Sequence, residues 1–311
     1  MLDKVMEQHT AGDPMGRQKF CSRKDTREIS RQMEQKGQAV SASSVGRLLK
    51  EKNYSLRLNR KSIAESNHPQ RDEQFKAIAA TRKQFEDAGH PVLSLDTKKK
   101  ELVGNFRNPG RIWTREEDVR HVYDHDFRTL AKAIAAPYGI YDMGLNVGTV
   151  VVGISGDTSE FAVDCIETWL TKIGFQSHSD IKNILLLCDS GGSNGYKNRL
   201  WKLGLYHKIC RRYGIEVTVC HYPAGASKWN PIEHRLFSFI SLEWAGVPLQ
   251  TLAIMLRCIR STKTAPGLRV NAFLNRRRYD KGIHIPDLQY NEICLHPHDV
   301  LPELNYTLKA A

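Results

Sequence analysis

Three carboxylates of this chain could act together on a metal ion. Asp96 and Asp189 each follow a strand-like apolar run, and Glu233 lies in the first turn of a predicted helix. Carboxylates that converge on one point repel one another unless cations are bound, and hard oxygen ligands select Mg²⁺ or Mn²⁺. Two such ions about 3.5–4 Å apart stabilise the attacking and leaving oxygens of a phosphoryl displacement. The expected chemistry is cleavage or joining of a phosphodiester.

Each acid also has an ordinary structural interpretation. Asp96 could be a solvated strand end, and Asp189 could form an Asx-turn before the glycines that follow it. Glu233 could complete a capping box with Asn230, the predicted N-cap of a helix that begins at Pro231. Other acids could replace Asp96 but end no clear apolar strand: Glu101, Asp124 and Asp126.

The residues around these acids narrow the possibilities. The glycine-rich turn at 190–195 lacks the spacing of a nucleotide-binding loop, so its glycines more plausibly let DNA or metal approach Asp189 closely. His221 and His234 flank the predicted site in the sequence. Either could position water or contact phosphate, and either could be structural.

The elements that must position the acids alternate along the second part of the chain. Strands are predicted at 92–96, 140–143, 149–154, 184–188 and 215–219, and helices at 157–174, 196–213, from 231 onward and at 249–260. A polar stretch at 105–126 is interpreted as an insertion, and the residues after 278 as irregular. An antiparallel start followed by alternating units predicts an α/β, ribonuclease-H-like fold, a mixed sheet flanked by helices. In that fold the strands ending in Asp96 and Asp189 lie side by side.

The first part of the chain predicts smaller units. Residues 1–24 show no period and are expected to be a disordered lead-in. Two short helices around Gly37, the first capped by Asp25 or Thr26 and the second by Ser41 or Ser43, give an all-α helix-turn-helix DNA-binding domain at 25–66. A small helical hairpin would share that outline. Residues 67–90 are predicted to form a connecting helix, and residues 91–311 the catalytic domain.

Composition favours a polyanionic partner. The 311 residues include 46 Lys and Arg against 34 Asp and Glu, a formal net charge of +12. No apolar run is long enough to span a bilayer, and the N-terminus lacks a secretory pattern, so a cytoplasmic, nucleoid-associated protein is expected. The 7 cysteines show no paired C-x-x-C spacing, which favours reduced thiols over zinc.

Five groups of residues carry a resemblance to a known family. They are LDTKKKEL with GNF at 95–106, PYGIYD at 137–142, DSGGSNG at 189–195, SKWN at 227–230 and IEHRLF at 232–237. In this order they resemble the bacterial insertion-sequence DDE transposases of the Rhodopirellula-type group, which are related to Tc1/mariner-like transposases. Members of that group usually carry further helical DNA-binding sequence upstream of residue 25, so the resemblance implies an N-terminally shortened copy.

The resemblance implies a function and a set of site residues. Asp96, Asp189 and Glu233 would be the catalytic triad and would hold two Mg²⁺ or Mn²⁺ ions. The protein would cleave the terminal inverted repeats of its element and join the 3′-hydroxyl ends to target DNA, as a homodimer on double-stranded DNA. Basic residues expected to hold phosphates are Arg47, Lys50, Lys52, Lys98, Lys99, Lys100, Lys197, Arg199, Lys202 and Lys228. The alternatives are an inactive copy that only binds DNA and another ribonuclease-H-like nuclease or integrase.

Overall fold

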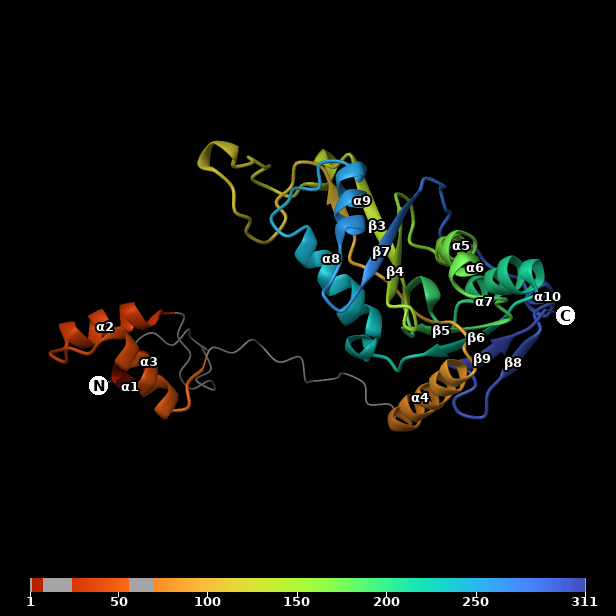
Figure 1. Ribbon diagram of the computed structural model, residues 1–311, viewed down its shortest axis with the longest axis horizontal. Coiled ribbons are helices and arrows are strands. Elements are labelled where there is room, and N and C mark those ends of the chain that lie inside the picture. The colour runs from red at the N-terminus through yellow and green to blue at the C-terminus, as the bar shows by residue number, and fades with distance from the viewer. Residues whose placement is uncertain (1, 8–23, 56–69, 311) are drawn as a thin grey trace. The chain divides into compact units, whose positions relative to one another are not determined.

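The computed structural model describes residues 2–7, 24–55 and 70–310, and the chain divides into two compact units, Met1–Ile63 and Ala64–Ala311 (Figure 1). The described part of the first unit contains the helices α1 (Leu2–Glu7), α2 (Thr26–Gln35) and α3 (Ala42–Glu51). Of the predicted caps, the Asp25 side chain accepts from the Glu28 N–H at 2.8 Å and Ser41 from the Ser44 N–H at 3.2 Å.

The predicted lead-in needs a correction at its start. Leu2–Glu7 form α1, because Leu2, Val5 and Met6 bury their side chains in one apolar cluster with residues of α2 and α3. The partners in this cluster are Ile29, Met33 and Val45. The remainder of the expected lead-in, residues 8–23, lies outside the described residues, as does the 56–69 stretch.

The second unit is built on one mixed sheet, with nine strands in the described part of the chain. The strands are β1 (Val92–Thr97), β2 (Glu101–Val103), β3 (Ala133–Asp142), β4 (Val147–Gly153), β5 (Asn183–Cys188), β6 (Glu216–His221), β7 (Arg269–Asn275), β8 (Leu295–Pro297) and β9 (Asn305–Leu308). Their order is β7-β4-β3-β1-β5-β6-β9-β8, and β2 pairs with β3. As predicted, β3 and β4 form an antiparallel hairpin, and β1 lies beside β5 in parallel.

Helices cover both faces of this sheet. They are α4 (Arg71–Asp87), α5 (Ser159–Trp169), α6 (Phe175–Ser177), α7 (Arg199–Leu205), α8 (Ser238–Glu243), α9 (Leu252–Ser261) and α10 (Asp287–Tyr290). Wide π-helical turns adjoin some of them, namely η3 (Leu170–Gly174), η5 (Tyr206–Arg211) and η7 (Glu233–Phe237). In Figure 1, α5 and α7 lie on one side of β4, and α8 and α9 on the other. Alternate residues of β4 follow this division, since Val151 packs with α5 while Val150 and Val152 pack with α8 and α9.

The C-terminal residues differ from the prediction of irregular structure. β9 pairs antiparallel with β6, placing Tyr306 opposite Val219, and β8 pairs with β9. Tyr306 and Leu308 are fully buried, which explains why so short a segment becomes a strand. β7 was also not predicted, and it pairs in parallel with β4. The sheet is therefore wider at both edges than the sequence indicates.

Candidate active site

Asp96 and Asp189 lie together at the C-terminal ends of two adjacent central strands, β1 and β5. β1 and β5 pair in parallel with Leu95 opposite Cys188, so the next residue on each strand is one of these acids. Both acids line a single cleft, together with the turn at 190–192 and the segment 223–227. Gly192 in that turn has a φ of 75°, a left-handed conformation that glycine adopts without strain. The order of strands and helices in the sequence predicted that these two strands are adjacent, and their adjacency brings the two acids together.

Glu233 lies beside these two acids without joining them in the cleft lining. It is the first residue of η7, it is half-buried, and its charge acts on both Asp96 and Asp189. Within the described ranges, no three His, Cys, Asp or Glu side chains are close enough together to hold one metal ion. The structure thus brings two of the three predicted acids together and leaves the third within electrostatic reach.

Negative charge accumulates in this cleft. Burial, with repulsion from Asp189, raises the pKa of Asp96 to about 8. Burial also raises the pKa of Asp189, although a hydrogen bond from Asn230 opposes the shift. The largest charge effects on Asp96 come from other carboxylates: Asp189, Glu233 and Asp157. Carboxylate oxygens are the donors that a divalent cation takes, so Asp96 and Asp189, which share the cleft, suit the predicted metal.

Asn230 connects the elements that carry the acids. Its side-chain Nδ2 donates to the Leu95 carbonyl at 3.1 Å and to Asp189 Oδ1 at 3.0 Å. Its Oδ1 accepts from the Ser94 hydroxyl, and that hydroxyl accepts from the Ile232 N–H at 3.0 Å. Asn230 is fully buried, so these bonds lie out of water and link β1, β5 and the helix of Glu233.

This arrangement corrects part of the predicted helix cap. The helix begins at Pro231 as predicted, and the Asn230 carbonyl accepts from the Glu233 N–H at 3.2 Å. The Asn230 side chain caps no helix, because both of its polar atoms are committed to Leu95, Asp189 and Ser94. The Asn230 N–H donates to the Ser227 carbonyl at 2.9 Å, so it is not the partner of Glu233 in a capping box. Glu233 therefore does not form the capping box that was the structural alternative to a metal-binding role.

The two histidines near the site behave differently. His221 is fully buried, and its Nδ1 donates to the Asp189 carbonyl at 3.0 Å while Tyr306 donates to its Nε2 at 3.2 Å. Burial lowers the pKa of His221 to about 4, so the ring is neutral at physiological pH. It supports the backbone at Asp189 and does not reach the cleft lining. His234 is exposed, with its Nε2 2.6 Å from the Lys228 carbonyl oxygen.

The predicted phosphate-binding residues differ in exposure. Lys98 and Lys202 are partly buried: Lys98 pairs with Glu101 at 3.6 Å and keeps only 12% of its side chain exposed, and Lys202 lies over the Tyr306 ring at 4.6 Å. The others are exposed: Arg47, Lys50 and Lys52 in the first unit, and Lys99, Lys100, Lys197, Arg199 and Lys228 in the second. Exposure does not exclude a partner within the protein, since Arg199 pairs with an acid of α10 and Lys228 lies over the Trp229 ring.

Sequence reasoning missed three residues of the site. Ser94 and Asn230 form the buried network, and Asp157 accepts a hydrogen bond from the Thr97 hydroxyl at 3.2 Å and adds to the charge on Asp96. Asp157 was predicted only as the start of the helix at 157–174, and the cap of α5 is Thr158. The one local signal for Asn230 was its place three residues before Glu233, which also suits a cap.

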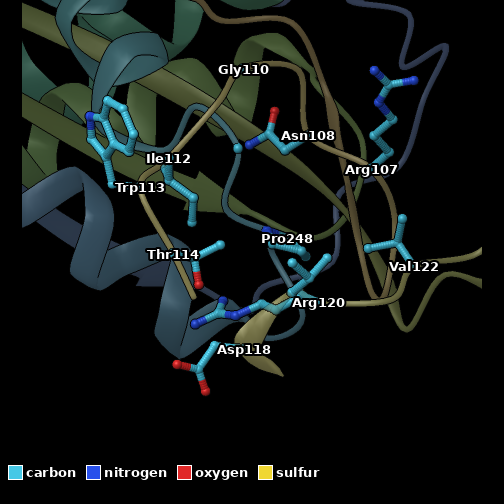
Figure 2. Close-up of a pocket in the computed structure, with 12 residues that line it drawn as sticks. Arg107, Asn108, Gly110, Ile112, Trp113, Thr114, Asp118, Arg120, Val122 and Pro248 are labelled. Atoms are coloured by element: carbon cyan, nitrogen blue, oxygen red, sulfur yellow. The ribbon is translucent and has the colours of Figure 1, made fainter. Parts of the chain in front are cut away.

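A larger cavity lies at the insertion between β2 and β3, away from the predicted triad. Figure 2 labels Arg107, Trp113 and Arg120 of the insertion among the residues that line it, together with Pro248. Asp118 also lines it, but Asp96, Asp189 and Glu233 do not. This cavity is therefore not the site of the predicted chemistry.

Comparison with known proteins gives one family match and several structural likenesses. The family model described as "Rhodopirellula transposase DDE domain" matches residues 1–310. No curated protein matches the chain. None of the described helices is long and apolar enough to cross a membrane.

Similar solved structures include several Mos1 complexes. The Mos1 transposase paired-end complex with left transposon end has 12% identity and a TM-score of 0.44, and the Mos1 mariner paired end complex with Mn has 14% and 0.43. A pre-cleavage Mos1 transpososome has 12% identity and a TM-score of 0.43. Each alignment covers 75% of this chain and 65% of the other, so the chain spans about two thirds of the length of these proteins.

Proposed function

This chain belongs to the family described as the Rhodopirellula transposase DDE domain, and from that premise we propose that it is a DNA transposase. It cleaves the ends of its mobile element and joins the freed 3′-hydroxyl ends to target DNA. Residues 91–311 form its ribonuclease-H-like catalytic domain, and residues 25–66 its helix-turn-helix DNA-binding domain. The observation that carries the proposal is the pair of acids at the ends of β1 and β5, which share one cleft.

Asp96, Asp189 and Glu233 are the proposed catalytic acids and metal ligands. Asp96 and Asp189 share the cleft lining, and Glu233 completes the set from the start of η7. Two divalent cations bound there would stabilise the charge on the attacking and leaving oxygens of the phosphodiester. Such ions would favour the charged form of Asp96 against the burial and the repulsion that raise its pKa, so their binding would release its proton.

The side chain of Asn230 orients the proposed metal ligands. Asn230 holds one oxygen of Asp189 through its amide and leaves the second oxygen free of that bond. The same amide bonds to the Leu95 carbonyl, so the backbone immediately before Asp96 is held by the same side chain. Groups behind the ligands commonly set ligand orientation and metal affinity, and here one buried side chain serves both acids.

DNA is the proposed partner, and exposed lysines lie close in the chain to the proposed catalytic acids. Lys99 and Lys100 follow β1, Lys197 follows the glycine-rich turn, and Lys228 precedes Asn230. Each therefore lies on a segment that also carries or adjoins a proposed catalytic acid. In the first unit, Arg47, Lys50 and Lys52 are exposed along α3 and its C-terminal end, where they suit recognition of the element ends. Because two ends must be joined in one event, we propose that a homodimer acts on DNA.

The deciding experiment is cleavage of DNA that carries the sequences flanking this gene, with Mg²⁺ or Mn²⁺ and with EDTA. The wild type is compared with Asp189→Asn and with Asp124→Asn, the same substitution at an exposed acid of the insertion. We expect metal-dependent nicking at the element boundary for the wild type and Asp124→Asn, and none for Asp189→Asn. Binding without cleavage by all three proteins would instead support a copy that only binds DNA. Cleavage unaffected by Asp189→Asn would disprove the assigned site.

A further inference from the structure

An exposed tryptophan, Trp229, lies two residues after Ser227 of the cleft lining, and two cationic side chains lie against its ring. We infer that Trp229, together with Arg71 and Lys228, forms a stacking site for an unpaired nucleotide of the DNA strand that enters the cleft, a role that rests on the proposed transposase function. The partner is thus DNA with a locally single-stranded segment beside the cleavage site, and not uniformly paired duplex.

The position of Trp229 is fixed by its neighbours in the chain. It ends the short helix η6 (Ser227–Trp229), whose first residue, Ser227, lines the cleft with Asp96. The residue after it is Asn230, which is hydrogen-bonded to Asp189. Although it lies between two residues tied to the site, Trp229 keeps 45% of its surface exposed.

The indole is also held rigidly by α4. The ring of Phe75 meets it edge-on, with centroids 5.6 Å apart and an interplanar angle of 60°. Phe75 in turn packs against the buried Tyr222 at 6.2 Å. A ring that is anchored in this way offers a binding surface with little loss of side-chain freedom when a ligand binds.

The charges around Trp229 suit a nucleotide. Lys228 Nζ lies 4.0 Å and Arg71 Cζ 4.8 Å from the centroid of the indole. An exposed contact between a cation and an aromatic ring is weaker than stacking of a base on an aromatic side chain. An unpaired base can therefore take the place of one cation on the ring, and the displaced cation is then free to contact the phosphate of the same nucleotide.

Paired DNA does not present the required surface. Bases inside a duplex stack on one another, so away from the duplex ends only an unpaired nucleotide exposes a face to the indole. Duplex DNA can still contact Arg71 and Lys228 through its phosphates. The stacking site thus predicts a preference for a single-stranded segment, whereas a purely electrostatic patch, or a Trp229 that only covers α4, predicts no such preference.

The test measures DNA binding by the full chain carrying Asp189→Asn, so that the DNA stays intact. The probes are a short blunt duplex and the same duplex with a single-stranded oligothymidine tail that contains one 2-aminopurine. Trp229→Leu keeps an apolar side chain against Phe75 but removes the aromatic face, and Trp229→Phe keeps a smaller ring. Trp113→Leu, at an exposed tryptophan of the insertion, is the matched control.

We expect Trp229→Leu to weaken binding of the tailed duplex roughly tenfold and to abolish quenching of the 2-aminopurine, with little effect on the blunt duplex. Trp229→Phe should recover most of the affinity, and Trp113→Leu should bind both probes as the parent does. Equal losses for both probes, no loss, or no preference for the tail in the parent would overturn the inference.

Cleavage by the wild type, measured separately, distinguishes the two proposals. If Trp229→Leu loses affinity only for the tailed duplex and the wild type never cleaves DNA, the stacking site is supported and the transposase function is not. Cleavage by the wild type, combined with unchanged tail binding by Trp229→Leu, would overturn the stacking site alone.

Discussion

The acidic cleft and the cavity at the insertion between β2 and β3 are lined by very different residues. The insertion cavity is the larger, about 530 Å³ against about 360 Å³ for the cleft. Its rim exposes large apolar side chains such as Trp113, which is fully open to solvent. The cleft is bordered by acids whose carboxylates are partly buried and repel one another, backed by the fully buried Asn230.

In each region the side-chain amide of an asparagine donates to a backbone carbonyl that is distant in the sequence. Asn108 donates from its amide to the carbonyls of Trp244 at 2.8 Å and Val247 at 3.2 Å. Asn230 donates in the same way to the Leu95 carbonyl, but its second acceptor is the carboxylate of Asp189. One asparagine ties a loop to the fold, and the other ties the fold to a proposed metal ligand. Cavity size alone would favour the insertion, whereas the hydrogen bonds of the buried Asn230 favour the cleft as the proposed site.

The largest expected effect separates the acids of the two regions. Asp96→Asn should lower metal-dependent DNA cleavage about 10³-fold or more, because the variant loses a proposed ligand of the ions that stabilise the transition state. Asp126→Asn, in the insertion, should leave the rate within about twofold. The measurement is the single-turnover cleavage rate at saturating Mg²⁺, with DNA binding checked in parallel. A similar loss in both variants would remove the distinction between the regions.

The two anchoring asparagines give the next effect. Asn230→Ala should raise the Mn²⁺ concentration needed for half-maximal cleavage about 10- to 100-fold, because Asp189 loses the donor that orients it. Asn108→Ala removes a comparable pair of bonds and should leave the Mn²⁺ requirement unchanged. Direct Mn²⁺ binding, followed by electron paramagnetic resonance, provides a readout independent of activity. Equal Mn²⁺ affinities in the two variants would argue against an orienting role for Asn230.

The charge in the cleft predicts a pH dependence of stability. The folded-state pKa of Asp96 is about 8, above the unfolded value of about 3.9, so the folded state holds its proton more tightly. The contribution of Asp96 to stability is therefore greatest below about pH 4 and is lost as the pH rises to about 8. Relative to the wild type in EDTA, Asp96→Asn should gain about 2 kcal/mol between pH 5 and pH 8.5, less than the full shift because the cleft is partly open to water.

Denaturant unfolding at the two pH values measures this gain. Asp126→Asn serves as the control and should show no change in relative stability between them. Mg²⁺ should stabilise the wild type more at the higher pH, because the ion then meets an ionised Asp96. A gain for Asp96→Asn that is the same at both pH values would show that the Asp96 carboxyl does not titrate in this range.

The smallest effect belongs to the insertion. Trp113→Ser should change the free energy of unfolding by less than about 0.5 kcal/mol, because an exposed side chain loses little burial on substitution. Denaturant unfolding at one pH is sufficient to measure it. A loss of several kcal/mol would mean that the insertion contributes to the fold as strongly as the elements around the cleft.

Much of the second unit could be predicted from the sequence, because its signals are local or follow from topology. The unbroken apolar run of β5 predicted a strand buried on both faces, and residues 184–188 are fully buried. The alternation of strands and helices predicted that β1 and β5 are adjacent, which places Asp96 beside Asp189. The edge strands β8 and β9 were missed, because each has only a few residues and depends on β6 for its pairing.

The side-chain partners were decided by the tertiary structure. By its type and position Asn230 is a good helix cap, yet its amide bonds to the Leu95 carbonyl, a residue 135 positions away. Likewise, Lys98 looks like a phosphate ligand in the sequence, but it pairs with Glu101 and lies over the Trp244 ring. Local preference depends on the neighbouring few residues, whereas a buried polar group must take whichever partner the packed chain brings within reach. The sequence by itself therefore determined which strands carry the acids, and only the folded chain determined which side chains hold them.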